Sequence, residues 1–99
     1  MTDSACDEKG APHNSGGPLA GLRILDLTQF LAGPYATMIF ADLGAEVIKL
    51  EAPAGDWSRV LPPNFVGGDS CYYLSINRNK KSIVVDLKNA GGMAVVRRL

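Results

Sequence analysis

The spacing of apolar residues predicts a strand, a helix and a second strand within residues 22–51. Residues 23–28 form a short apolar run of the length and composition typical of a buried strand. Residues 46–51 repeat this pattern, so we expect a second strand there. The connection between the two strands has the length of a helical crossover, which predicts a right-handed βαβ unit.

The crossover helix is predicted to begin near Pro34 and to end at Gly44. Proline suits the first helical position, Gly33 gives the chain freedom to turn, and Gly44 suits the left-handed residue after a helix. Asp42 is unfavourable, because the helix dipole repels a negative charge in the last turn. One stripe of apolar residues is expected to face the sheet: Tyr35, Met38, Ile39 and Leu43.

The remaining chain predicts a long loop, a short helix, a third strand and a last helix. Residues 52–70 are rich in proline and glycine, and loops of this length are usually functional or packed against a partner. Asp69 is the expected N-cap of a helix at residues 71–76. We expect the third strand at residues 82–87 and the last helix at residues 89–99, where the first residue is an asparagine suited to the N-cap.

This order of elements predicts an α/β, Rossmann-like βαβ fold with a three-stranded, mainly parallel sheet. Residues 1–18 are polar and rich in Gly, Ser, Asp and Pro, which indicates a disordered leader before a folded part at residues 19–99. Two main helices do not cover both faces of such a sheet, so apolar surface and an unpaired edge should be exposed. The chain therefore reads as an N-terminal fragment of a larger domain.

Three large apolar side chains and four cations are candidates for binding. Trp57, Phe65 and Val66 lie in the long loop, where we favour a role as anchors over a ligand mouth or a subunit contact. Charge runs are usually solvated turns, but groups at the carboxyl ends of parallel strands line the ligand crevice. Four cations around the third strand are thus candidates for holding phosphates: Arg78, Lys80, Lys81 and Lys88.

Composition excludes several classes of function. Ten basic and ten acidic side chains cancel, so the net charge does not favour nucleic acid or an anionic membrane as a partner. No apolar stretch has the length of a membrane span, and Cys6 and Cys71 are expected to be free thiols in the cytoplasm. His13, the single histidine, lies in the leader, so we expect no histidine-based nucleophile and no metal site.

The first turn also argues against a dinucleotide. Residues 28–34 read TQFLAGP, whereas a dinucleotide-binding turn needs G-x-G-x-x-G so that the backbone approaches the pyrophosphate. Glu51 matches only superficially the acid that binds a ribose. We expect Asp26, inside the first strand, to be a structural hydrogen-bonding residue.

Three stretches together resemble the N-terminal part of the family III (CaiB/BaiF) CoA-transferases: LRILDLTQFLAGPYATMIFADLGAEVIKLE at 22–51, GDWSR at 55–59 and YYLSINRNKKSIVVDLK at 72–88. The resemblance covers residues 18–99 and is greatest to the branch with succinyl-CoA-dependent and formyl-CoA transferases. It implies a Rossmann-like large domain, in a ring-shaped subunit that interlocks with a second copy as a homodimer. Such enzymes move CoA between carboxylic acids through an aspartyl anhydride and an aspartyl-CoA thioester.

The resemblance also implies which residues contact CoA, and where the chain departs from the family. The nucleophilic aspartate lies beyond Leu99, so no catalytic residue is expected here and the chain alone should be inactive. Leu31 stands where the formyl-CoA branch has glutamine, which puts the oxalate-specific contacts of that branch in question. Ala52 stands where that branch has a CoA-contacting arginine, so one phosphate contact is either missing or supplied by Arg59. The implied CoA contacts are Leu31, Ala32, Val85, Asp86, Leu87 and Lys88.

Two alternatives remain open at this point. The 2-methylacyl-CoA racemases share these N-terminal motifs while moving a proton through residues located downstream. A truncated, non-catalytic protein that binds a nucleotide or a partner through its exposed sheet is the other. Downstream sequence separates the first alternative from a transferase, and the folding behaviour of the isolated chain tests the second.

Overall fold

The computed structural model describes residues 16–99, so most of the predicted leader, with Cys6 and His13, lies outside the described residues. Residues 16–18, at the end of the predicted leader, form a turn. This turn lies against the end of the first helix, because a Cβ atom at Gly17 would come within 2.0 Å of the Leu43 carbonyl oxygen. The backbone N–H of Leu19 donates to the same oxygen at 2.9 Å.

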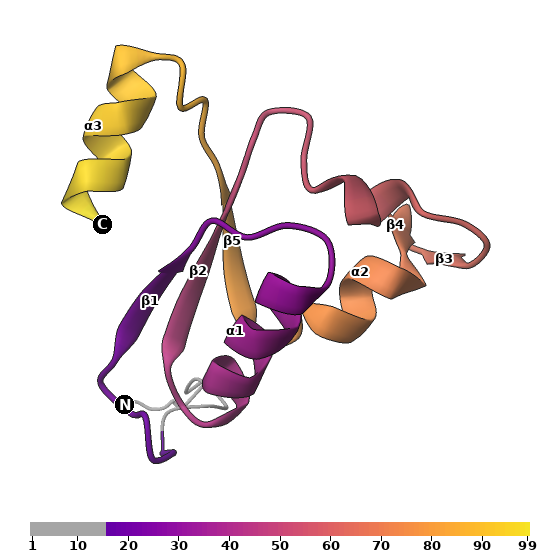
Figure 1. Cartoon of the computed structure of the whole chain (residues 1–99), viewed down its shortest axis with the longest axis horizontal. Coiled ribbons are helices and arrows are strands. Elements are labelled where there is room, and N and C mark those ends of the chain that lie inside the picture. The colour runs from indigo at the N-terminus through magenta and orange to yellow at the C-terminus, as the bar shows by residue number, and fades with distance from the viewer. Residues whose placement is uncertain (1–15) are drawn as a thin grey trace.

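The predicted three-stranded parallel sheet is confirmed. Its strands are β1 (Arg23–Asp26), β2 (Glu46–Glu51) and β5 (Lys80–Val84), in the order β1-β2-β5 (Figure 1). Val47 of the central strand lies opposite Ile24 on one side and the first residue of β5 on the other. All but the first residue of β2 are buried, so the sheet is built around this strand.

The third strand is displaced from its predicted position at residues 82–87. It begins two residues earlier and ends at Val84, which is paired with Glu51, the last residue of β2. Beyond that pair only the N–H of Val85 continues the ladder, donating to the Glu51 carbonyl at 2.9 Å. The basic run at residues 77–81 therefore leads into the amino end of β5.

The crossover helix α1 (Ala32–Asp42) begins two residues before Pro34, with Leu31 at the N-cap. The chain turns at Phe30, whose φ is +74°, and not at Gly33. Gly33 instead permits close packing, since a Cβ atom there would lie 2.4 Å from the Thr28 Cβ. The prediction for the other end is confirmed: Gly44 follows the helix with a φ of +105°.

The prediction for the buried face of α1 is mostly wrong. Met38 is buried, but the other three members of the predicted stripe are exposed by 39–52 %. The sheet face under α1 carries the charged side chains of Asp26 and Lys49. The helix therefore covers this face mostly with small or polar residues, and the Thr37 hydroxyl donates to Asp26. The buried residues of α1 are Pro34, Thr37, Met38 and Ala41. The apolar core beneath it contains Ala41, Ala45 and Val47, with Leu19 and Ile24 packed against them.

The long loop at residues 52–70 contains structure of its own. A short 3₁₀ helix, η1 (Trp57–Val60), is followed by the antiparallel strands β3 (Phe65–Val66) and β4 (Asp69–Ser70). The predicted short helix is confirmed as α2 (Cys71–Ile76). Its N-cap is Ser70, whose hydroxyl accepts from the Tyr72 N–H at 3.1 Å, and not Asp69.

The apolar side chains of this loop are not the anchors that we predicted. Trp57, Phe65 and Val66 are exposed by 58 %, 48 % and 62 %. Trp57 and Tyr72 each stack on Phe30, with ring centroids 5.3 and 5.5 Å from that of Phe30, so the three rings form a cluster in which Tyr72 is half-buried. Ion pairs hold the loop instead, as described below.

The last helix, α3 (Ala90–Arg98), is confirmed with its predicted N-cap: the Asn89 Oδ1 accepts from the Gly91 N–H at 2.8 Å. It stands apart from the sheet and none of its residues is buried (Figure 1). Exposed apolar sheet surface, as expected, includes Val84, which is 62 % exposed. Within residues 16–99, no helix has the length and apolar character that crossing a membrane requires.

Candidate functional site

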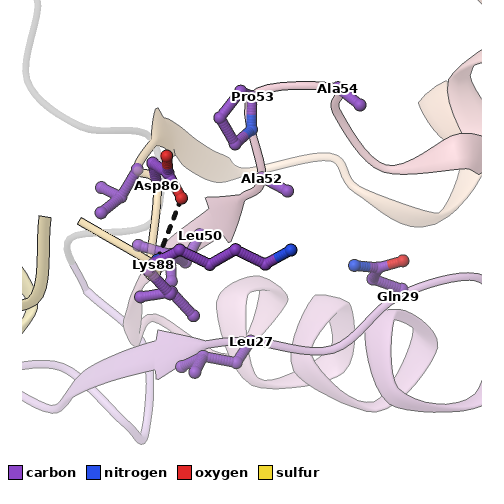
Figure 2. Close-up of a pocket in the computed structure, with 10 residues that line it drawn as sticks. Leu27, Gln29, Leu50, Ala52, Pro53, Ala54, Asp86 and Lys88 are labelled. Atoms are coloured by element: carbon purple, nitrogen blue, oxygen red, sulfur yellow. Dashed lines mark hydrogen bonds between the residues drawn. The ribbon is translucent and has the colours of Figure 1, made fainter.

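A cavity of about 480 Å³ lies at the carboxyl ends of all three parallel strands (Figure 2). Leu27 follows β1, Leu50 lies near the end of β2, and Val85 follows β5. Side chains alternate between the two faces of a strand, and Asp26 points toward α1. The leucines therefore face the other side, away from α1. The lining residues are Leu27, Gln29, Leu50, Ala52, Pro53, Ala54, Val85, Asp86, Leu87 and Lys88.

Three polar side chains interrupt this apolar lining: Gln29, Asp86 and Lys88. The Asp86 Oδ1 accepts from the backbone N–H of Lys88 at 3.0 Å, which fixes the turn after β5. The Lys88 side chain extends across the cavity toward Gln29 (Figure 2). Among residues 16–99 the Lys88 ammonium has no carboxylate partner, so it presents a positive charge to the cavity.

The other three cations proposed for phosphate binding are not at this site, so that prediction is wrong for them. They lie at the amino end of β5, whereas the cavity lies at its carboxyl end. The hydrogen bonds that Arg78 donates to Asp42 raise the pKa of its guanidinium. Burial lowers the pKa of Lys80, although the Asp26 carboxylate opposes that shift. Each cation has an acidic partner: Arg78 with Asp42 at 2.7 Å, Lys81 with Glu46 at 2.7 Å and Lys80 with Asp26 at 3.2 Å.

The cavity includes four of the six residues implied to contact CoA, those at 85–88. The other two do not line it: Leu31 caps α1 and is 45 % exposed, and Ala32 begins that helix. Of the remaining lining residues, only Ala52 was connected with CoA by the resemblance, as the position where the related branch has an arginine. Their common signal is that each lies at or just after the end of a strand: Leu27, Gln29, Leu50, Ala52, Pro53 and Ala54.

Charged side chains are buried on the opposite face of the sheet, under α1 and η1. Lys49, in the central strand, is fully buried, and its Nζ lies 2.9 Å from the Asp56 Oδ2. The same ammonium donates to the Thr28 carbonyl at 3.0 Å. Burial opposes ionisation of Asp56, but Lys49 and hydrogen bonds from Ser58 outweigh it and lower the pKa of the carboxyl. A buried charge pair thus joins the chain after β1 to the chain after β2.

Glu51 is the centre of a second buried group. Arg59 donates to it through Nε at 2.8 Å and Nη2 at 2.7 Å, and the Arg59 guanidinium also lies 3.9 Å from the centre of the Tyr73 ring. Burial raises the pKa of Glu51, but these bonds and others outweigh it, so the pKa lies well below its usual range. The Glu51 side chain is 2 % exposed, whereas the Arg59 side chain is 28 % exposed and also pairs with Asp69 at 3.0 Å. The other donors to Glu51 are the Asp56 N–H, the Tyr73 hydroxyl and the Ser82 hydroxyl.

Asp26 is the structural hydrogen-bonding residue that the sequence predicts. It is 1 % exposed and accepts from the N–H and hydroxyl of Thr28, from the Thr37 hydroxyl at 2.6 Å and from Lys80 at 3.2 Å. Burial opposes its ionisation, but the bonds from Thr28 and Thr37 outweigh it and lower the pKa of the carboxyl. This carboxylate therefore fixes the turn between β1 and α1.

The family model for CoA-transferase family III matches residues 19–99. The chain belongs to this family. Among family III relatives, succinyl-CoA:glutarate CoA-transferase of Homo sapiens is 59% identical over 83 residues, which are 83% of this chain and 19% of that protein. Succinate–glutarate CoA-transferase of Agrobacterium fabrum is 47% identical over 89 residues, covering 83% of this chain and 22% of that protein.

Solved family III structures agree with the fold. The crystal structure of a CaiB/BaiF family protein from Brucella suis is matched with a TM-score of 0.78 at 41% identity. That match covers 83% of this chain and 23% of the Brucella chain. The chain thus spans about a fifth of the length of the curated relatives that it matches.

Proposed function

We propose that the chain forms the N-terminal, CoA-binding part of a CoA-transferase that moves CoA between carboxylic acids. The observation that carries the proposal is the cavity at the carboxyl ends of β1, β2 and β5, toward which the Lys88 ammonium extends without a carboxylate partner among residues 16–99. Ligands of open α/β sheets bind at this edge. The names of the relatives, which are CoA-transferases, favour transfer over the racemase alternative.

The chemistry of the cavity suits the two halves of CoA. An ammonium at the end of a flexible stem binds phosphate as a point charge, and Lys88 supplies one. The apolar side chains of Leu27, Leu50 and Leu87 suit the largely apolar pantetheine arm. Asp86 would act indirectly, because its carboxylate holds the Lys88 backbone. For Leu31 and Ala32 the family resemblance is the only support.

The proposed reaction uses an aspartyl anhydride and an aspartyl-CoA thioester, with the nucleophile outside these 99 residues. Asp26 and Asp56 are buried and each is engaged in an ion pair, which supports assigning neither of them that role. Given the similar relatives, we propose succinyl-CoA as donor and a dicarboxylate as acceptor, in a cytoplasmic, interlocked homodimer. The chain incubated with succinyl-CoA and glutarate should give no glutaryl-CoA, and robust transfer would refute the placement of the nucleophile.

Isothermal titration of the chain with CoA tests the binding proposal, with far-UV circular dichroism as the check of folding. We expect Lys88→Ala to weaken CoA binding about tenfold, because a hydrogen bond to a charged group is lost. Lys81→Ala is the matched control: its ammonium is paired with Glu46 at the other end of β5, so affinity should not change. Absence of CoA binding by the folded chain, or equal losses in the two variants, would contradict the proposal.

A further inference from the structure

Lys49 joins the two chain segments that form walls of the cavity, without lining the cavity itself. Its ammonium lies on the face of the sheet opposite the cavity, where it donates to the Thr28 carbonyl at 3.0 Å and pairs with the Asp56 carboxylate at 2.9 Å. Leu27 and Gln29, on either side of Thr28, line the cavity. Residues 52–54, which lead to Asp56, form another part of the lining.

Each wall also has hydrogen bonds to the strand that precedes it. Asp26 fixes Thr28 through hydrogen bonds to its N–H and hydroxyl, while Glu51 accepts from the N–H of Asp56 at 2.9 Å. The Lys49 ammonium bonds to both walls, and among residues 16–99 the only other contact described above between these two segments is the stacking of Phe30 on Trp57, the residue after Asp56. Its position on β2, the central strand, places it between them.

Burying the Lys49 ammonium carries a large desolvation penalty, so the stability of the sheet alone does not explain this residue. Lys49 and Asp56 are 0 % and 2 % exposed, and a buried ion pair often contributes no more stability than well-packed apolar residues. The Lys49 ammonium instead fixes the positions of two groups, the Thr28 carbonyl and the Asp56 carboxylate. Because Phe30 follows with a φ of +74°, the path of the first wall is also one that the backbone does not favour by itself.

From this geometry we propose that Lys49 is a positioning residue that sets the separation of the two cavity walls and thereby the affinity for the ligand. The proposal rests on the proposed function only in taking CoA as that ligand. The effect of Lys49 on the positions of residues 27–31 and 52–56 is expected in the ligand-free chain as well.

The decisive variant removes both charges and keeps the cap of η1. In Lys49→Met/Asp56→Asn the amide oxygen still accepts from Ser58, as Asp56 Oδ1 does at 2.9 Å, and no unpaired charge is buried. Lys49→Met alone should lower both the melting temperature and the CoA affinity. In the double variant the melting temperature should recover, while CoA affinity stays about tenfold below that of the unaltered chain, since one charge-assisted hydrogen bond to the first wall is missing. Recovery of affinity together with stability would overturn the proposal.

Hydrogen–deuterium exchange without CoA separates this proposal from the proposed function. We expect faster exchange in both residues 27–31 and residues 52–56 of the double variant, with exchange in β5 unchanged. The matched control is Glu46→Gln/Lys81→Met, an exposed pair with Nζ–Oε2 at 2.7 Å, which should leave both segments unchanged. If the unaltered chain failed to bind CoA, faster exchange in both segments would still support the tie between the walls, and unchanged exchange in either would overturn it.

Discussion

Replacing Arg59 by methionine should remove more than half of the stability of the fold. Arg59 gives Glu51 two hydrogen bonds, and the Glu51 side chain is only 2 % exposed. Breaking a buried pair from one side costs about 3–5 kcal/mol, because the remaining charge has no partner. Glu51 keeps donors from Tyr73 and Ser82, so the lower end, about 3 kcal/mol, applies. Domains of this size have a free energy of unfolding of about 5 kcal/mol.

Urea denaturation at neutral pH, followed by far-UV circular dichroism, measures this loss. With a slope of about 1 kcal/mol per molar urea, the midpoint for Arg59→Met should fall by about 3 M. Arg23→Met is the matched control: its pair with Glu46 is solvent-exposed, and such pairs contribute about 0.5 kcal/mol. Equal midpoints for the two variants would refute the reasoning that the Glu51 group holds the long loop on the sheet.

Three further outcomes are expected. Stability should fall as the pH drops below about 5, because the pKa of Glu51 is lowered in the folded state and the unfolded chain therefore takes up the proton first. Urea titrations across this pH range should show a weaker dependence of the free energy of unfolding on pH for Glu51→Gln, and an unchanged dependence would contradict this. Gly33→Ala should cost about 2 kcal/mol, since the added Cβ would lie 2.4 Å from another side chain, whereas Gly16→Ala, with open space around it, should leave the melting temperature unchanged. Ser70→Ala should cost about 1 kcal/mol through loss of the α2 cap, and Ser75→Ala on the exposed side of α2 should cost clearly less in the same thermal melts.

The elements that the sequence predicts well are those fixed by local patterns. The strands β1 and β2, the short helix α2, and the cap of α3 at Asn89 depend on neighbouring residues, and Gly44 ends α1 because its φ is positive. The face of α1 could not be predicted in this way. It depends on Lys49 and Glu51, which look like solvated positions of an alternating strand until Asp56 and Arg59 fold back over them.

The candidate site could likewise be predicted from the sequence only in part. The family resemblance implied residues 85–88, and the rule that ligands bind at the carboxyl ends of parallel strands pointed independently to Lys88. The structure places all four residues around a cavity. The same rule, applied to the ends of the other two strands, would have led to Gln29 and Ala52. The basic run was misassigned because the boundary of β5 depends on where β2 ends, which puts Lys80 inside the strand and at its far end.

Nuclear magnetic resonance of the ¹⁵N-labelled chain, titrated with CoA, shows where the ligand binds. We expect the amide signals that move to belong to residues around the cavity, above all Gln29, Ala52 and Lys88. Signals from the amino end of the sheet, such as those of Glu46 and Lys81, should stay in place. Movement confined to that end, or no movement at saturating CoA in a folded chain, would contradict the claim that the carboxyl-end cavity binds CoA.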